Sequence, residues 1–183
     1  MRRQVATAIA KIGELAGLSR SLPPEDPGSQ SALQASFIAA IADARKLLAN
    51  AAYEPAGEER SNRRPIDLGV LVDLEVVMLM VTVIYRLNTE PAWTEAPQLA
   101  RQAALAHDGA LAVWLEKCAA WVESGTGGLA IEMTLPEPPH LGERAGLTVR
   151  ATWYRLLDIR LRSILGQAMR AAELRAANAT VHG

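Results

Sequence analysis

A long apolar segment near the middle of the chain restricts its fold more than any other feature. The segment IDLGVLVDLEVVMLMVTVIY begins at Ile66 and is apolar around almost the whole helical circumference. It is interrupted only by three carboxylates, Asp67, Asp73 and Glu75. A membrane span needs about 18 or more apolar residues with few or no charges, and the longest uncharged run here, 76–85, is too short. We therefore expect a buried central helix at about 66–88.

Composition favours one helical domain with no covalent or metal framework. The chain has 183 residues, which is enough to bury a core within a single domain. Stretches rich in Ala, Leu and Arg alternate with Pro and Gly clusters, a pattern that favours helices over sheets. The formal net charge of -1 provides no global field to attract nucleic acid. The single cysteine, Cys118, excludes an intramolecular disulfide framework and a thiolate zinc site.

Apolar periodicity predicts four further helices, at about 4–18, 31–52, 95–123 and 144–178. Prolines or glycines separate them. The expected core stripe of the 95–123 helix is Leu99, Ala103, Ala106, Ala110, Val113 with Trp114, Cys118 and Trp121. That of the last helix is Trp153, Leu156, Leu157, Leu161, Ile164, Leu165 and Ala168. Residues 129–143 contain three prolines and predict an extended connection or a short edge strand.

These elements predict an all-α protein, an antiparallel bundle of about five helices. The single helical domain covers 4–179 and residues 180–183 form a tail. The glycines of SGTGG, from Ser124, suit the end of the fourth helix. The apolar stripe of the first helix fits either its own chain or a neighbouring copy.

Two carboxylates, Asp73 and Glu75, lie within the apolar centre and need partners there. We expect a helix rim or an ion pair with arginines of the last helix, and the alternative is a ligand or proton site. In principle, Asp108 can orient the imidazole of His107, which would then act as one member of an acid–base pair. Side chains at adjacent helix positions do not face each other, however. We therefore expect both at the surface. The histidines are too few and too dispersed to predict a metal site, and no cofactor motif is present.

Three tryptophans, Trp114, Trp121 and Trp153, are candidates to line a ligand pocket together with Met78 and Met80. Packing in the core is the favoured interpretation for them, as it is for Cys118.

The segment 142–183 carries seven arginines against three carboxylates. A solvated helix face is the simpler interpretation, and contact of Arg170 and Arg175 with an anionic lipid surface is the alternative. Aromatic residues do not interleave with these arginines, which argues against nucleic acid as a partner.

The order of features is similar to a known family. A helix ending in LLANAAYEPAGEER, a basic loop, the helix LVDLEVVMLMVTVIYRL and a final Ala- and Arg-rich helix follow one another. This order resembles the soluble domain of fusaric-acid-resistance-type (FUSC family) aromatic acid efflux proteins. The Tyr53-Glu54-Pro55 turn is the most family-like short motif, and the resemblance covers about Val5 to Ala179. It implies a helical domain placed between two blocks of membrane helices.

By this resemblance, the chain is a piece of an inner-membrane efflux transporter for aromatic or hydrophobic organic acids. It implies an assembly, structural or gating role without enzymatic activity, on the cytoplasmic side of the bacterial inner membrane. The partners implied are the membrane portion of the parent transporter and further copies of the domain. The alternative is a free-standing soluble cytoplasmic bundle that binds a small hydrophobic ligand or a partner protein. An enzyme using His107, or Asp73 with Glu75, is a third reading.

Overall fold

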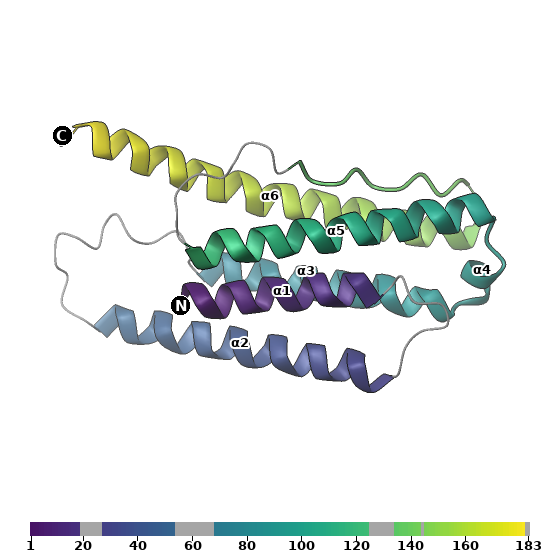
Figure 1. The fold of residues 1–183 in the computed structure, drawn as a ribbon, viewed down its shortest axis with the longest axis horizontal. Helices are drawn as coiled ribbons and strands as arrows, with labels where there is room; N and C mark the ends of the chain where they lie inside the picture. Colours follow the sequence, from purple (N-terminus) through teal and green to yellow (C-terminus); the bar gives the residue numbers. More distant parts are fainter. Residues whose placement is uncertain (19–26, 54–67, 125–133, 144, 182–183) are drawn as a thin grey trace.

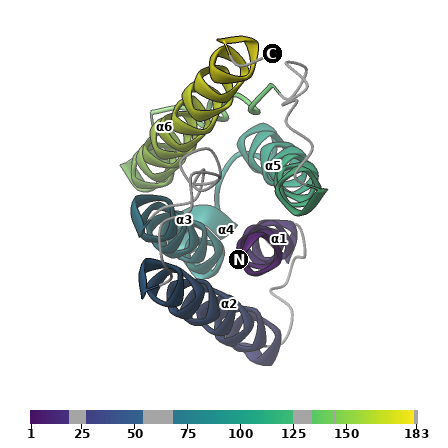
Figure 2. The ribbon, with the colours of Figure 1, turned by 90° about the vertical axis from the view of Figure 1, so that its left-hand side faces the viewer.

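Helix α1 (Arg2–Leu18) lies at the centre of the molecule, packed against α2, α3 and α5 (Figure 2). A computed structural model describes residues 1–18, 27–53, 68–124, 134–143 and 145–181, without the side chains of 167–181. The buried residues of α1 are Val5, Ala6, Ala8, Ile9, Ile12, Gly13, Leu15 and Ala16. The apolar stripe expected for this helix is therefore confirmed, and it docks on its own chain.

The other helices are α2 (Pro27–Tyr53), α3 (Leu68–Arg86), α4 (Pro91–Thr94), α5 (Gln98–Ser124) and α6 (Ala145–Val181), with a short 3-10 turn, η2 (Leu87–Thr89), before α4. The described residues contain no strand, so the expectation of an all-α protein is confirmed. In Figure 1, α1 and α3 run in one direction, and α2, α5 and α6 run in the other. The extended residues 134–143 return along the molecule, which lets α5 and α6 point the same way.

Small residues allow α1 and α5 to approach closely. A Cβ atom added at Gly13 would lie 3.2 Å from the Cβ of Leu115 and 3.3 Å from the carbonyl oxygen of Ala112. Such distances are tighter than most contacts of a Cβ atom, so a larger residue at this position would require the neighbouring atoms of α5 to shift by a few tenths of an ångström. Glycine therefore suits this close approach, at a modest cost in helix propensity.

Helix α3 confirms the helix expected at 66–88, but its burial is one-sided. Its buried residues are Leu71, Asp73, Leu74, Val77, Met78, Val81, Thr82, Ile84 and Tyr85. Leu68, Val72 and Leu79 lie on the opposite side and are exposed. Among the described residues, 68–89 is the one helical stretch long and apolar enough to cross a membrane by length and composition, and half of its most apolar window is buried in the protein.

The core stripe expected for α5 is wrong over most of its first half, whereas Trp114 is buried as expected and Cys118 packs against the core. Leu99 is 80% exposed, and Ala106, Ala110 and Val113 are also exposed. The buried residues of this helix are instead Ala100, Ala104, His107, Asp108, Leu111, Trp114, Leu115 and Ala119. Alanine occurs on both faces of this helix and so does not indicate which side is buried, and the two polar residues His107 and Asp108 in fact belong to the core.

In α6, the expected core residues Leu157 and Leu161 are buried, and Trp153, Ile164 and Leu165 are partly buried. Leu156 is exposed, which corrects its assignment to the core. The side chain of Ala168 lies outside the described residues.

Two connections complete the fold. Between α3 and α5 the chain forms η2 and then α4, where Pro91 occupies the first helical position that suits proline. The extended connection is confirmed over 134–143, where no strand forms, and Leu135 and Leu141 attach it to the core. The SGTGG glycines lie outside the described residues.

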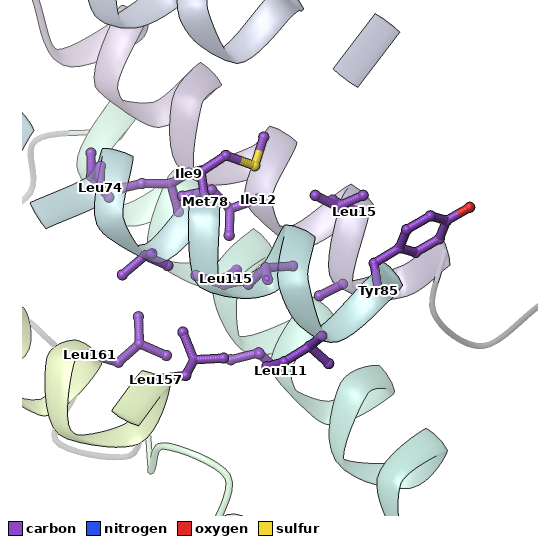
Figure 3. Close-up of a cluster of buried hydrophobic side chains, with 14 of the residues drawn as sticks. Ile9, Ile12, Leu15, Leu74, Met78, Tyr85, Leu111, Leu115, Leu157 and Leu161 are labelled. Carbon is purple, nitrogen blue, oxygen red and sulfur yellow. The ribbon is translucent and has the colours of Figure 1, made fainter. Parts of the chain in front are cut away.

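Figure 3 shows a part of the apolar core where four helices meet, and α2 also contributes Phe37, Ala40, Ile41 and Ala44 to the core. Ile9, Ile12 and Leu15 come from α1, Leu74, Met78 and Tyr85 from α3, Leu111 and Leu115 from α5, and Leu157 and Leu161 from α6. Because α1 contributes to contacts with three other helices, its side chains carry much of the packing energy.

We predict that Ile12→Ala lowers the free energy of unfolding by about 2–5 kcal/mol, because it leaves a cavity at a side chain with 0% exposure. Urea unfolding followed by circular dichroism measures the change. The matched control is Ile38→Ala on α2, where the side chain is 65% exposed and the change should stay within about 0.5 kcal/mol. Equal losses for the two variants would contradict the central position of α1.

Candidate functional site

A buried polar cluster lies where α4, α5 and α6 meet. It consists of Trp93 from α4, His107 and Asp108 from α5, and Arg150 and Tyr154 from α6, and we call it the Arg150 cluster. All five residues are buried, with Arg150 only 2% exposed. Charged residues are almost never fully buried unless they are paired, so this cluster is the most unusual chemical feature of the molecule.

Asp108 and Tyr154 form the best-defined contact of the cluster. The Tyr154 hydroxyl donates to Asp108 Oδ1 at 2.8 Å, and it accepts a longer bond of 3.3 Å from Arg150 Nη2. Burial raises the pKa of Tyr154 far above its usual range, and the negative charge of Asp108 adds to this effect. The hydroxyl therefore keeps its proton and holds the carboxylate in place.

His107 completes the α5 side of the cluster. Its Nδ1 lies 3.5 Å from Asp108 Oδ1, and its ring meets the Tyr154 ring edge to face at 4.8 Å between centroids. The expectation that His107 and Asp108 lie at the surface is wrong. Although consecutive helix residues point in different directions, both side chains lie within the broad buried side of α5.

Arg150 is held mainly by aromatic stacking and charge. Its guanidinium carbon lies 3.8 Å from the centroid of the Trp93 ring, and Nη2 lies 3.9 Å from Asp108 Oδ2. A desolvated contact of this type between a cation and an aromatic ring contributes about 2 kcal/mol. The solvated arginine face expected for the last helix therefore does not include Arg150.

Several polar atoms of the cluster have no hydrogen-bond partner within the described part of the chain. They are Arg150 Nε, Arg150 Nη1, Trp93 Nε1 and Asp108 Oδ2. A buried donor or acceptor left without a partner costs about 1–3 kcal/mol. The cluster is therefore poorly satisfied by its own residues.

Glycine at position 146 sets the distance between α4 and the start of α6. A Cβ atom added at Gly146 would overlap the Cβ of Ala92. This close approach places Trp93, the next residue of α4, against Arg150 one turn further along α6. The short helix α4 thus covers the Arg150 cluster because both Ala92 and Gly146 are small.

The two carboxylates singled out in the apolar segment both form ion pairs. Asp73 accepts from Arg160 of α6 at 2.8 Å, which agrees with the expected pairing with the last helix. Glu75 pairs instead with Arg45 of α2 at 2.7 Å. Because both pairs are partly exposed, each contributes little to stability, about 0–1 kcal/mol. Their main effect is to fix which neighbours α3 takes.

The tryptophans proposed for a pocket have different environments. Trp114 belongs to the buried core, Trp153 packs against that core, and Trp121 is half-buried. These positions agree with the preference for packing over a ligand pocket. Arg170 and Arg175 lie in α6, but their side chains are outside the described residues.

Sequence reasoning missed Arg150, Tyr154 and Trp93 as site residues. One available signal was the i, i+4 spacing of Arg150 and Tyr154, which places both on one face of α6. In the residues that the structure describes, no group of three His, Cys, Asp or Glu side chains is arranged to hold a metal ion. The arrangement is suited to binding and to holding helices together, since its ionisable groups are closed off from solvent.

Comparison with known proteins gives no relative: no protein-family model, curated protein or solved structure matches this chain. The similarity to fusaric-acid-resistance proteins therefore remains a prediction from the motifs of the sequence.

We predict that Tyr154→Phe lowers the free energy of unfolding by about 1–3 kcal/mol, because Asp108 Oδ1 loses its buried donor. Chemical denaturation measures the change. Thr152→Val on the same helix removes an exposed hydroxyl bonded to the Thr148 carbonyl, and it should change stability by less than about 0.5 kcal/mol. A Tyr154→Phe variant as stable as the control would show that the buried hydrogen bond makes no net contribution to stability.

Cys118 provides a test that depends on pH. Burial raises the pKa of this thiol from 9.0 to about 12 in the folded state. Only the thiolate is alkylated, so at pH 8 the folded chain should react with iodoacetamide roughly a thousandfold more slowly than the unfolded chain. Because the pKa of this thiol is higher in the folded chain than in the unfolded chain, its ionisation lowers the free energy of unfolding as the pH rises from 9.0 towards about 12. Equal alkylation rates in buffer and in guanidinium chloride would contradict this environment.

Proposed function

We propose that this chain is the soluble helical domain of an inner-membrane efflux transporter for aromatic or hydrophobic organic acids. Its role is structural, in assembly or gating, without enzymatic activity of its own. The single observation that supports this role best is an exposed apolar surface centred on α3. We call it the α3 face, and it consists of Leu68, Val72 and Leu79 with the apolar residues beside them on α2 and α6.

The α3 residues of this face lie on one side of the helix, where the partly exposed Glu75 interrupts them between Val72 and Leu79. Leu68, Val72 and Leu79 are separated by four and seven positions, which places them on one side of the helix. The ion pair between Glu75 and Arg45 joins this side of α3 to α2, and the pair between Asp73 and Arg160 joins the other side to α6. The two neighbouring helices therefore flank the stripe.

The apolar surface continues on both flanking helices. Gln34 of α2 donates to Thr82 of α3 at 3.0 Å, and the two helices run in opposite directions. Ile38, one turn along α2 and 65% exposed, therefore lies near the level of Leu79. On α6, Leu156 lies one turn before Arg160 and is exposed. We infer that Ile38 and Leu156 border the α3 residues of this face.

Apolar patches of this kind typically mark contact with a protein or a membrane. Glu75 and Asp73 beside the stripe are paired with arginines of the neighbouring helices, and the exposed Arg86 follows Leu79 by seven positions on the same side of α3. An apolar partner, such as the helices of the membrane portion of the parent protein, fits it better than a charged one. The resemblance places that partner on the cytoplasmic side of the bacterial inner membrane.

The parent gene provides the first test. Translated sequence on both sides of this segment should contain blocks of apolar segments of about 20 residues. Stop and start codons close to either end would exclude the transporter proposal. Such a result would leave the second candidate, a free-standing helical binding protein, which the unsatisfied donors of the Arg150 cluster favour.

We predict that Leu79→Arg in the parent protein prevents stable association of the domain with the membrane portion. The physical reason is that an arginine placed at a 60% exposed position has to be desolvated when the α3 face is covered. Gel filtration of the detergent-solubilised protein, combined with proteolysis of undocked domains, measures the association.

The matched control for this experiment is Leu99→Arg on α5, where the side chain is 80% exposed and lies outside the α3 face. It should leave association unchanged. Neither substitution should change the unfolding of the isolated chain by more than about 0.5 kcal/mol, since both sites are exposed. Normal association of the Leu79→Arg protein would reject docking through this face.

A further inference from the structure

The Arg150 cluster contains more unpartnered donors than acceptors. Arg150 Nε, Arg150 Nη1 and Trp93 Nε1 are buried nitrogens that carry hydrogens and have no hydrogen-bond partner among the described residues. The one acceptor of the cluster in the same condition is Asp108 Oδ2. An added group that supplies only acceptors would satisfy this excess, and an ionised carboxylate is such a group.

We propose that the Arg150 cluster binds a small oxyanion of the carboxylate class, with the size of formate or acetate. The guanidinium of Arg150 and the indole N–H of Trp93 would supply its hydrogen bonds. Bonds between a guanidinium and a carboxylate are roughly twice as strong as bonds between neutral groups. Arg150 and Trp93 are each only 2% exposed, so the ligand has to be small.

The stacking of Trp93 leaves the donors of Arg150 available. The indole ring covers the face of the guanidinium at 3.8 Å, whereas the N–H groups of arginine point outward in the plane of the group. A carboxylate at the edge of the guanidinium therefore does not compete with Trp93. The aromatic ring excludes water from one side and so strengthens the charged contact.

Asp108 lowers the affinity of the cluster for the anion but does not occupy the anion's position beside Arg150. Oδ2 lies 3.9 Å from Arg150 Nη2, which is close enough to offset the positive charge but too far for a hydrogen bond. The Tyr154 hydroxyl holds the other oxygen, Oδ1, at 2.8 Å. The carboxylate of Asp108 therefore repels a second anion, and removal of its charge should increase anion affinity.

The test uses the four tryptophan indole N–H signals and the arginine Nε–H signals in nitrogen-15 NMR spectra of the 183-residue chain. Sodium formate is compared with sodium chloride at equal ionic strength. We expect formate to shift the signals of Trp93 and Arg150 saturably. The indoles of Trp114, Trp121 and Trp153 serve as internal controls and should not move with them. The variant Trp93→Phe assigns the Trp93 signal.

Asp108→Asn should bind formate about tenfold more tightly, which corresponds to about 1.4 kcal/mol. The amide oxygen still accepts from Tyr154, so the fold has a partner for that hydroxyl. Arg150→Lys should abolish saturation, and Arg160→Gln, at a partly exposed arginine of the same helix, should leave it unchanged. Variants that change only stability would not shift affinity in opposite directions.

Three outcomes would overturn the proposal. One is an absence of saturable shifts, which would mean that water satisfies the donors. Another is an equal response to chloride and formate, which would indicate a general salt effect. The third is an Asp108→Asn protein that binds formate no more tightly than the original chain. If Arg150→Lys does not fold, the first two outcomes and the Asp108→Asn comparison still decide whether the Arg150 cluster binds the anion. Benzoate binding as tight as that of formate would reject the size limit.

Discussion

The close packing of α1 against its neighbours is the constraint on which the rest of the structure depends. Gly13 allows the α1 backbone to approach Leu115 and Ala112 of α5 so closely that a side chain there would require these neighbours to shift. From this position, α1 also packs against α2 and α3, so one helix of 17 residues joins most of the bundle. Helix α6 packs against α3 and α4, and the bond from Tyr154 to Asp108 also joins it to α5.

The Arg150 cluster and the α3 face differ in burial and in polarity. The cluster is closed, charged and poorly satisfied by its own residues, and the proposal of a small bound anion rests on these properties. The α3 face is open and largely apolar, with Asp73 and Glu75 in ion pairs beside it, and the proposal that another part of the protein covers it rests on these properties. Helix α6 connects them, with Arg150 in one and Leu156 in the other.

Sequence reasoning succeeded where apolar residues contrast with polar ones. The helix from Arg2 to Leu18 and the apolar helix α3 were both predicted, since their stripes stand out against charged neighbours. The prediction for α5 failed because alanine carries little information on which side is buried. The prediction also failed for Asp108 and His107, because ionisable residues are normally exposed and these two are buried together.

The sequence by itself determined the all-α class and the approximate positions of the long helices, because propensity and periodicity act within a single segment. Only the tertiary structure decided that α1 is central, that α3 keeps an exposed side, and that α4 brings Trp93 onto Arg150. These features depend on distances between helices, set by small residues such as Gly13 and Gly146. A pattern along one helix does not record which neighbour will lie against it.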